Sequence, residues 1–337
     1  MKKSLIYLFS LLCMLTLVTS CSDDEKGGTD DAWKEISKEY TSGITANGLS
    51  TSGTVNVNAA SADKATIILN NLVAGESSVS VDATLKKTDT GYAFEGESTA
   101  TTCNVKVSGT IELGANDKED KVNISINRTL TSALAGTMDL NFISGESLMA
   151  QTYFEINTGN TEQDAILKGM ATSFLGQLIA QQVESVSVKL GEEGTFSFSF
   201  KKVGASEETV MPPAKLQEMI KSYLTWYEKE NVLYLAVHKD ALTILSGLNI
   251  LPENIDLETI LGLLTVEGDY YTISLQVKEE DGLTTIYLNK DILVKAWEVA
   301  KPLVGNIQDE TIQSILAMVD QVMAKAKEIE FGLVFKK

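Results

Sequence analysis

The chain has 337 residues, of which 44% are hydrophobic, so it can build one large core or two smaller ones. Its 46 acidic residues outnumber its 28 basic residues, which gives a formal net charge of -18. Nucleic acid is therefore not expected as a partner, because phosphate binding requires a basic face.

The first 20 residues have the pattern of a cleaved secretory signal. Lys2 and Lys3 form a basic start, and the apolar run from Leu5 to Val18 is too short to span a bilayer. The run ends in Leu-Val-Thr-Ser directly before Cys21, which resembles the lipobox of bacterial lipoproteins. That resemblance implies that Cys21 becomes the first mature residue and carries the acyl chains of a lipid anchor.

The residues after Cys21 are polar and acidic: Ser22, Asp23, Asp24 and Glu25. They resemble the export signal by which Bacteroides-type bacteria carry lipoproteins to the outer leaflet of the outer membrane. This resemblance implies a location on the cell exterior, with the outer membrane as partner through acylated Cys21. The alternative is an acidic tether with no role in export. Residues 21–31 as a whole are expected to form a flexible acidic tether, because charge and glycine dominate them.

Residues 32–144 show apolar residues in alternation, in about eight short segments with turn-rich breaks between them. No helical period interrupts this pattern. It predicts an antiparallel sheet that curls or closes, as in an up-and-down barrel or a sandwich. The segments centre on Tyr40, Val55 and Val57, Ile67 and Leu69, Val79 to Leu85, Tyr92 and Phe94, Val105 to Ile111, Val122 to Ile126, and Met138 to Phe142.

The spread of these segments, from Tyr40 to a closing strand at Gly136 to Leu140, resembles the lipocalin-like, or calycin-like, domain of Bacteroides-type surface lipoproteins of unknown function. The resemblance implies a mainly β, barrel-like N-terminal domain. Cys103 lies beside an alternating strand and is expected to be a buried small residue rather than a nucleophile. No intramolecular disulfide is expected, because Cys13 leaves with the signal and Cys21 is acylated.

Residues 145–337 change to a mixed pattern and predict an α+β domain, with helices packed on an antiparallel sheet. A long amphipathic helix is expected over 161–184, followed by a hairpin over 186–200 whose phenylalanines face it. Pro212 and Pro213 are expected to open a second helix that extends to Tyr227. Further helices are expected at 257–264, 290–301 and 308–327. Strands are expected at 153–156, 266–277, 283–288 and 329–335, and the second and third of them are expected to form a hairpin about Glu280-Asp281-Gly282.

Residues that could carry chemistry are few. His238 is the only histidine, so a paired-histidine zinc site is excluded, and no Gly-x-Ser-x-Gly motif accompanies it. Glu95 and Glu97 share one face of a strand, as paired catalytic acids would, but an exposed sheet face explains them better. Asp117, Glu119 and Asp120 lack the spacing of a calcium loop. No catalytic residue, metal site or cofactor is expected.

The aromatic residues leave two interpretations open. Trp33, Trp226 and Trp297 could stack on sugars, but Trp226 and Trp297 lie in helical patterns, so core packing is the preferred interpretation. The stripe Phe196, Phe198 and Phe200 could line an apolar site against the long helix.

Together these patterns predict a non-enzymatic, lipid-anchored protein of the outer-membrane surface that binds a small apolar ligand or a surface protein. A glycan hydrolase with paired carboxylates is one alternative, and a structural or adhesion module without a pocket is another.

Overall fold

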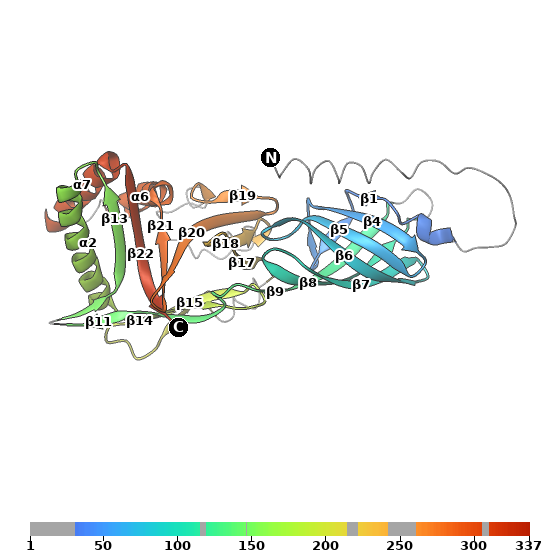
Figure 1. Cartoon of the computed structure of the whole chain (residues 1–337), viewed down its shortest axis with the longest axis horizontal. Coiled ribbons are helices and arrows are strands. Elements are labelled where there is room, and N and C mark those ends of the chain that lie inside the picture. Colours follow the sequence, from blue (N-terminus) through green and yellow to red (C-terminus); the bar gives the residue numbers. More distant parts are fainter. Residues whose placement is uncertain (1–30, 115–118, 146, 214–221, 242–260, 305–309) are drawn as a thin grey trace, which may run out of the picture.

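The computed structural model describes residues 31–114, 119–145, 147–213, 222–241, 261–304 and 310–337. The signal segment, Cys21 and the residues Ser22, Asp23, Asp24 and Glu25 lie outside the described residues. The molecule is elongated, with two large sheets placed end to end (Figure 1). A short 3-10 helix, η1 (Asp31–Lys34), precedes the first sheet at its free end.

The first sheet has nine strands in the order β1-β4-β5-β6-β7-β8-β9-β2-β3. Neighbouring strands are antiparallel except β2 and β9, which are parallel. The sheet curls into a half-barrel with β1 and β3 at its edges, which confirms the prediction of a mainly β, curled antiparallel sheet. Its strands are β1 (Glu39–Tyr40), β2 (Ile44–Ala46), β3 (Leu49–Ser50), β4 (Thr54–Ser61), β5 (Lys64–Val73), β6 (Glu76–Lys87), β7 (Gly91–Thr99), β8 (Cys103–Glu112) and β9 (Lys121–Leu130).

Apolar and polar residues alternate along each strand, which gives this sheet one buried face and one exposed face. In β6, Val79, Val81 and Leu85 are buried, whereas Ser80 and Asp82 are exposed. Side chains on successive residues point to opposite faces, so a period of two places the apolar set on the concave side. Cys103 is fully buried there, as predicted.

The strand predicted to close the first sheet belongs to the second. Gly136–Leu140 is β10, which pairs with β14 and with the C-terminal strand β22. The first sheet therefore ends at Leu130, before the predicted boundary at residue 144. An alternating pattern shows that one face is buried, but it does not show which strand lies alongside.

The second sheet has eleven strands, with the path β16-β15-β14-β10-β22-β21-β20-β18-β17 and with β13 on β22 and β19 on β20. All of its pairs are antiparallel, and β11 and β12 form a separate hairpin. The remaining strands are β11 (Phe142–Ser144), β12 (Leu148–Ala150), β13 (Thr152–Asn157), β14 (Val183–Leu190), β15 (Phe196–Lys202), β16 (Thr209–Met211), β17 (Leu224–Lys229), β18 (Val232–His238), β19 (Thr265–Glu267), β20 (Tyr270–Glu280), β21 (Leu283–Leu288) and β22 (Glu328–Lys336).

Three helices, α2 (Thr161–Gln182), α6 (Lys290–Val304) and α7 (Glu310–Lys325), lie at the end of the second sheet that is far from the first (Figure 1). Asn160 caps α2: its side-chain oxygen accepts a hydrogen bond from the Gln163 N–H at 3.2 Å. Among the described residues, no helix has both the length and the apolar character that a membrane span requires.

Two predictions in this half were wrong. Leu224 and Tyr227 were expected on a helix, but they lie on strand β17. The four residues from Leu224 to Tyr227 fit either a helical or a strand period, and pairing with β18 decides between them. The phenylalanine stripe does not face the long helix; α2 packs on β12 and β13, and Phe198 is 44% exposed. Residues 214–221 and the first half (257–260) of the helix expected at 257–264 lie outside the described residues.

One apolar core runs through both sheets. It includes Leu69 and Val73 of the first sheet and Trp226, Tyr227 and Leu233 of the second. A smaller cluster beneath the helices contains Leu293, Ala326 and Ile329. The junction between the sheets is therefore packed as a protein interior and not as a loose linker.

Candidate functional site

At the junction, two loops of the first sheet meet two segments of the second sheet. From the first sheet come the loop between β3 and β4 and the tight turn between β5 and β6. From the second come the end of β18 and the turn between β19 and β20. The predicted strand over 266–277 is in fact broken at this last turn, where Gly268 has a φ of +59°. The break places Asp269 at the junction.

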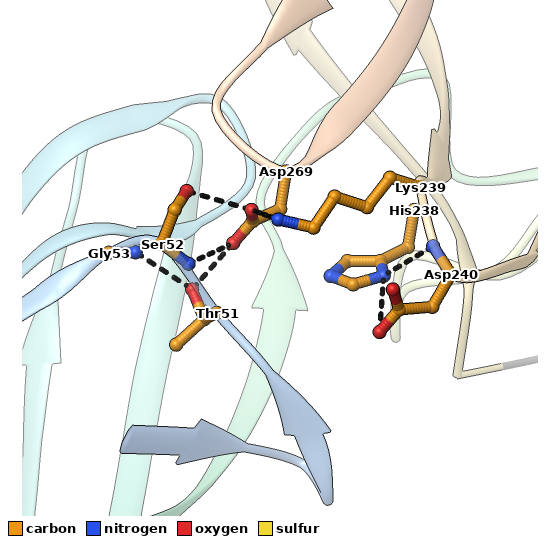
Figure 2. A network of polar contacts seen from close by, with 7 residues as sticks. All are labelled: Thr51, Ser52, Gly53, His238, Lys239, Asp240 and Asp269. Carbon is orange, nitrogen blue, oxygen red and sulfur yellow. Dashed lines mark hydrogen bonds and ion pairs between the residues drawn. The ribbon is translucent and has the colours of Figure 1, made fainter. Parts of the chain in front are cut away.

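Asp269 is the polar centre of the contact between the sheets (Figure 2). Its Oδ2 accepts hydrogen bonds from the Thr51 hydroxyl at 2.6 Å and the Ser52 N–H at 2.9 Å. Its Oδ1 accepts one from the Ser52 hydroxyl at 2.7 Å and pairs with the Lys239 ammonium. The Asp269 side chain is 3% exposed, so these partners replace the water that the carboxylate loses on folding.

The electrostatics of this cluster favour the ionised carboxylate. Burial opposes ionisation, but hydrogen bonds from Lys239, Thr51 and Ser52 outweigh it and hold the pKa of Asp269 well below its usual value. A group with a lowered folded pKa stabilises the fold at pH values above its unfolded pKa. That contribution is lost as the pH falls below about 4 and approaches the folded pKa.

Arg128, the only arginine of the chain, makes a second bridge. It extends from β9, and its Nη1 donates a hydrogen bond to the Ala74 carbonyl at 3.2 Å. Its Nη2 donates to the Thr225 hydroxyl on β17. The Leu130 N–H also donates to the Glu192 carbonyl at 2.7 Å. Together with the Asp269 cluster, these hydrogen bonds hold the two sheets in a fixed relative position.

A cavity of about 380 Å³ opens beside these bridges, between the β5–β6 turn and strands β17 to β20. Its size falls in the range of small-molecule sites. Its lining is mixed, with tyrosines and small apolar residues together with polar groups. The lining includes Asn71, Glu76, Tyr227, Lys229, Tyr234, Glu267 and Tyr270.

Stacked tyrosines form one wall of the cavity. The rings of Tyr227 and Tyr234 lie 4.8 Å apart and are inclined by 11°. The Tyr227 hydroxyl donates to Glu267 Oε2 at 2.6 Å, and burial together with this bond raises the pKa of Tyr227. Gly75, with a φ of +86°, lies against the Tyr227 ring, because a Cβ at this position would be 2.7 Å from Tyr227 Cδ2. Tyr234 is therefore the partly exposed member of a fixed pair.

Two carboxylates of the lining are held in place by other groups. Glu76 Oε1 accepts hydrogen bonds from the Thr102 N–H at 2.6 Å and the Thr102 hydroxyl at 2.9 Å. Glu267 is fixed by Tyr227. Each carboxylate has further lone pairs for a ligand, so the cavity offers prearranged acceptors next to an aromatic wall. Such a set suits a small molecule with one apolar face and several hydrogen-bond donors.

His238 has a structural role at the end of β18. Its Nδ1 accepts the Asp240 N–H at 3.2 Å, so the proton of the neutral ring is on Nε2. Burial lowers the pKa of His238, and the Tyr270 ring packs against it edge-on at 5.2 Å. The same Nδ1 lies 3.7 Å from Asp240 Oδ2, as Figure 2 shows, whereas a triad histidine donates a hydrogen bond from Nδ1 to a carboxylate.

The other residues singled out in the sequence lie away from the cavity. Glu95 and Glu97 are exposed on β7, as expected for an outer sheet face. Asp120 pairs with Lys38 and accepts the Gly114 N–H at 2.7 Å, whereas Asp117 lies outside the described residues. Within the described ranges, no three histidine, cysteine or acidic side chains form a group that could hold a metal ion.

The tryptophans are packing residues where the structure describes them. Trp226 is fully buried, with its Nε1 donating to the Gly191 carbonyl at 2.8 Å. Trp297 is half-buried on α6, and its Nε1 donates to Asp320 at 2.7 Å. Trp33 packs against the core of the first sheet. Core packing was the preferred interpretation for Trp226 and Trp297, although Trp226 is on a strand and not on a helix.

Sequence reasoning missed Tyr227, Tyr234, Glu267 and Asp269 as residues of one site. They lie on three strands and one turn, and their proximity depends on the register of β17, β18 and β20. The Gly268-Asp269 dipeptide was the one local signal, because it marks a turn inside an apolar run.

Comparisons of the chain with protein-family models, with curated proteins and with solved structures found no match.

Proposed function

We propose that this protein is a non-enzymatic, lipid-anchored protein of the outer-membrane surface that binds a small ligand in the cavity between its two sheets. The observation that carries the binding role is the tyrosine wall next to fixed carboxylates in a cavity of about 380 Å³. The ligand contacts Tyr234 through an apolar face and donates hydrogen bonds to Glu76 and Glu267. Glycan fragments and amphipathic metabolites have this character.

The proposed location rests on the sequence. Cys21 carries the acyl chains, and Ser22, Asp23, Asp24 and Glu25 direct the protein to the cell exterior. The curled first sheet is consistent with a lipocalin-like or calycin-like domain of the Bacteroides type, and the helices on the second sheet with an α+β domain. Other surface proteins remain an alternative class of partner.

A second candidate is hydrolysis of surface glycans, which needs two carboxylates in one cleft. Glu76 and Glu267 both line the cavity, and this observation favours the candidate. Thr102 donates two hydrogen bonds to Glu76 and Tyr227 donates one to Glu267, so both carboxylates are already held as acceptors. A hydrolase needs one carboxyl group that acts as a proton donor, and neither carboxyl group is the donor in these hydrogen bonds, so binding is the preferred function.

Replacing Glu267 by Gln, or Tyr234 by Ala, should remove ligand binding while the protein remains folded. The probes are a panel of oligosaccharides and fatty acids, measured as shifts of the thermal unfolding temperature of the full chain in detergent. Glu97→Gln is the matched control, because Glu97 is exposed on another sheet face. Equal shifts for wild type and both cavity variants would contradict the proposal. Cleavage of a glycan by wild type but not by Glu267→Gln would favour the hydrolase.

Replacing Cys21 by Ala should move the protein out of the membrane fraction, because the acyl chains are its proposed anchor. The measurement is fractionation of cells that express the full chain, followed by immunoblotting. Cys103→Ala is the control, since the Cys103 thiol is buried in the first sheet and should not affect location. Membrane association of Cys21→Ala at the wild-type level would refute anchoring through this residue.

A further inference from the structure

The two carboxylates that line the cavity each have one oxygen that no other protein group uses. Glu76 Oε1 accepts both hydrogen bonds from Thr102, and Glu267 Oε2 accepts the one from Tyr227. Within the ranges that the structure describes, Glu76 Oε2 and Glu267 Oε1 receive no hydrogen bond, and neither carboxylate pairs with a lysine or arginine. The cavity therefore offers unused acceptor oxygens from both sheets.

The tyrosine wall lies in a negative electrostatic environment. Burial first, and then the charges of Glu267 and Glu230, raise the pKa of the Tyr234 hydroxyl. Neighbouring negative charges have this effect because they disfavour the charged phenolate. The Arg128 guanidinium opposes the corresponding rise at Tyr227 but not at Tyr234, which is the partly exposed ring. The accessible part of the wall thus favours positive charge.

Lys229 is the one basic side chain of the cavity lining among the described residues. It lies two residues beyond Tyr227 on β17, so both side chains point to the same face of the strand. Its side chain is exposed. Because Glu76 and Glu267 face a single lysine, the lining has one more negative than positive charge.

Three kinds of ligand would meet this lining differently. An anion such as a fatty acid would bring its charge beside two carboxylates. A neutral sugar or alcohol would take water from the carboxylates without supplying an opposite charge, and such a loss is costly. An organic cation supplies that charge, donates charge-assisted hydrogen bonds and lies favourably over a tyrosine ring. The cation is the class that uses all of these features.

We propose that the cavity binds an organic cation, in which a protonated amine is attached to a flat or apolar body. This inference rests on the proposed binding function and adds the class of ligand. The ammonium group donates hydrogen bonds to the unused oxygens of the carboxylates, and the body lies against the Tyr234 ring. The net charge of -18 on the chain raises the concentration of cations near its surface and favours their capture.

Probes that share a body and differ in charge test this class. Phenethylamine, 2-phenylethanol and 3-phenylpropionate share a phenyl body, and glucosamine and glucose share a sugar body. Isothermal titration calorimetry with the full chain in detergent gives the dissociation constants at low and high salt. We expect one amine to bind at least about tenfold more tightly than its alcohol, the value of a charge-assisted hydrogen bond. Its affinity should fall as salt rises. The amine that binds identifies the body.

A glutamine variant then separates charge from hydrogen bonding. Glu267→Gln keeps an acceptor oxygen but removes the charge, so it should weaken the amine about tenfold. Glu97→Gln, on another sheet face, should keep the wild-type affinity. An alcohol or 3-phenylpropionate that binds as tightly as its amine, or an amine affinity independent of salt, would overturn the inference and leave the binding function standing. Absence of binding by these probes, oligosaccharides and fatty acids alike would overturn both.

Discussion

Replacing Asp269 by Ala should lower the free energy of unfolding by about 3 kcal/mol, because charge-assisted hydrogen bonds in a buried site are removed together. Thr51 and Ser52 lose their acceptor, and the loop that carries them loses its attachment to the second sheet. The measurement is urea denaturation followed by tryptophan fluorescence. Asp269→Ala should also flatten the loss of stability below about pH 4, since the wild-type contribution titrates there.

Lys239→Gln is the matched control for this prediction. Lys239 pairs with the same carboxylate, but its side chain is 44% exposed, so its removal should cost less than about 1 kcal/mol. A loss for Asp269→Ala no larger than that of Lys239→Gln would show that the cluster in Figure 2 does not hold the sheets together.

Replacing Trp226 by Ala should lower the free energy of unfolding by about 4 kcal/mol, the range seen when a buried aromatic residue leaves a cavity. Trp226 is fully buried in the core shared by the two sheets. Its loss also leaves the Gly191 carbonyl without the indole donor. Chemical denaturation followed by far-ultraviolet circular dichroism measures the effect, because removing a tryptophan changes the fluorescence signal.

Two further variants separate packing from hydrogen bonding at this position. Trp226→Phe keeps most of the ring volume and should cost about 1–2 kcal/mol, the value of a buried hydrogen bond. Trp297→Ala should cost less than Trp226→Ala, because Trp297 is half-buried on α6. If Trp226→Ala and Trp297→Ala are equally mild, the junction is not part of the main core.

The sequence was sufficient for the strands of the first sheet, because alternation in segments such as Val79 to Leu85 is a local signal. It was also sufficient for the hairpin between β20 and β21, where Asp281 and Gly282 have φ values of +53° and +75°, as the turn requires. It was insufficient where partners are remote. Nothing near Gly136–Leu140 indicates that its neighbours are β14 and β22.

The cavity could not be predicted from the sequence either, because its residues are also brought together by remote partners. Tyr227 and Tyr234 are paired across a hairpin, but that hairpin was not predicted, because Leu224 to Tyr227 also fit a helical period. Glu76 and Glu267 are separated by most of the chain and meet only because the two sheets dock. Local patterns specify elements, whereas the site depends on how the sheets meet.

The pairing of β22 has a consequence for the order of folding. β22 (Glu328–Lys336) lies inside the second sheet and pairs with β10, β13 and β21. β10 and β13 therefore complete their pairing only with a strand that is far away in the sequence, and such pairs form slowly because a long loop must close first. We expect the arrival of β22 to limit the rate at which this half of the protein folds.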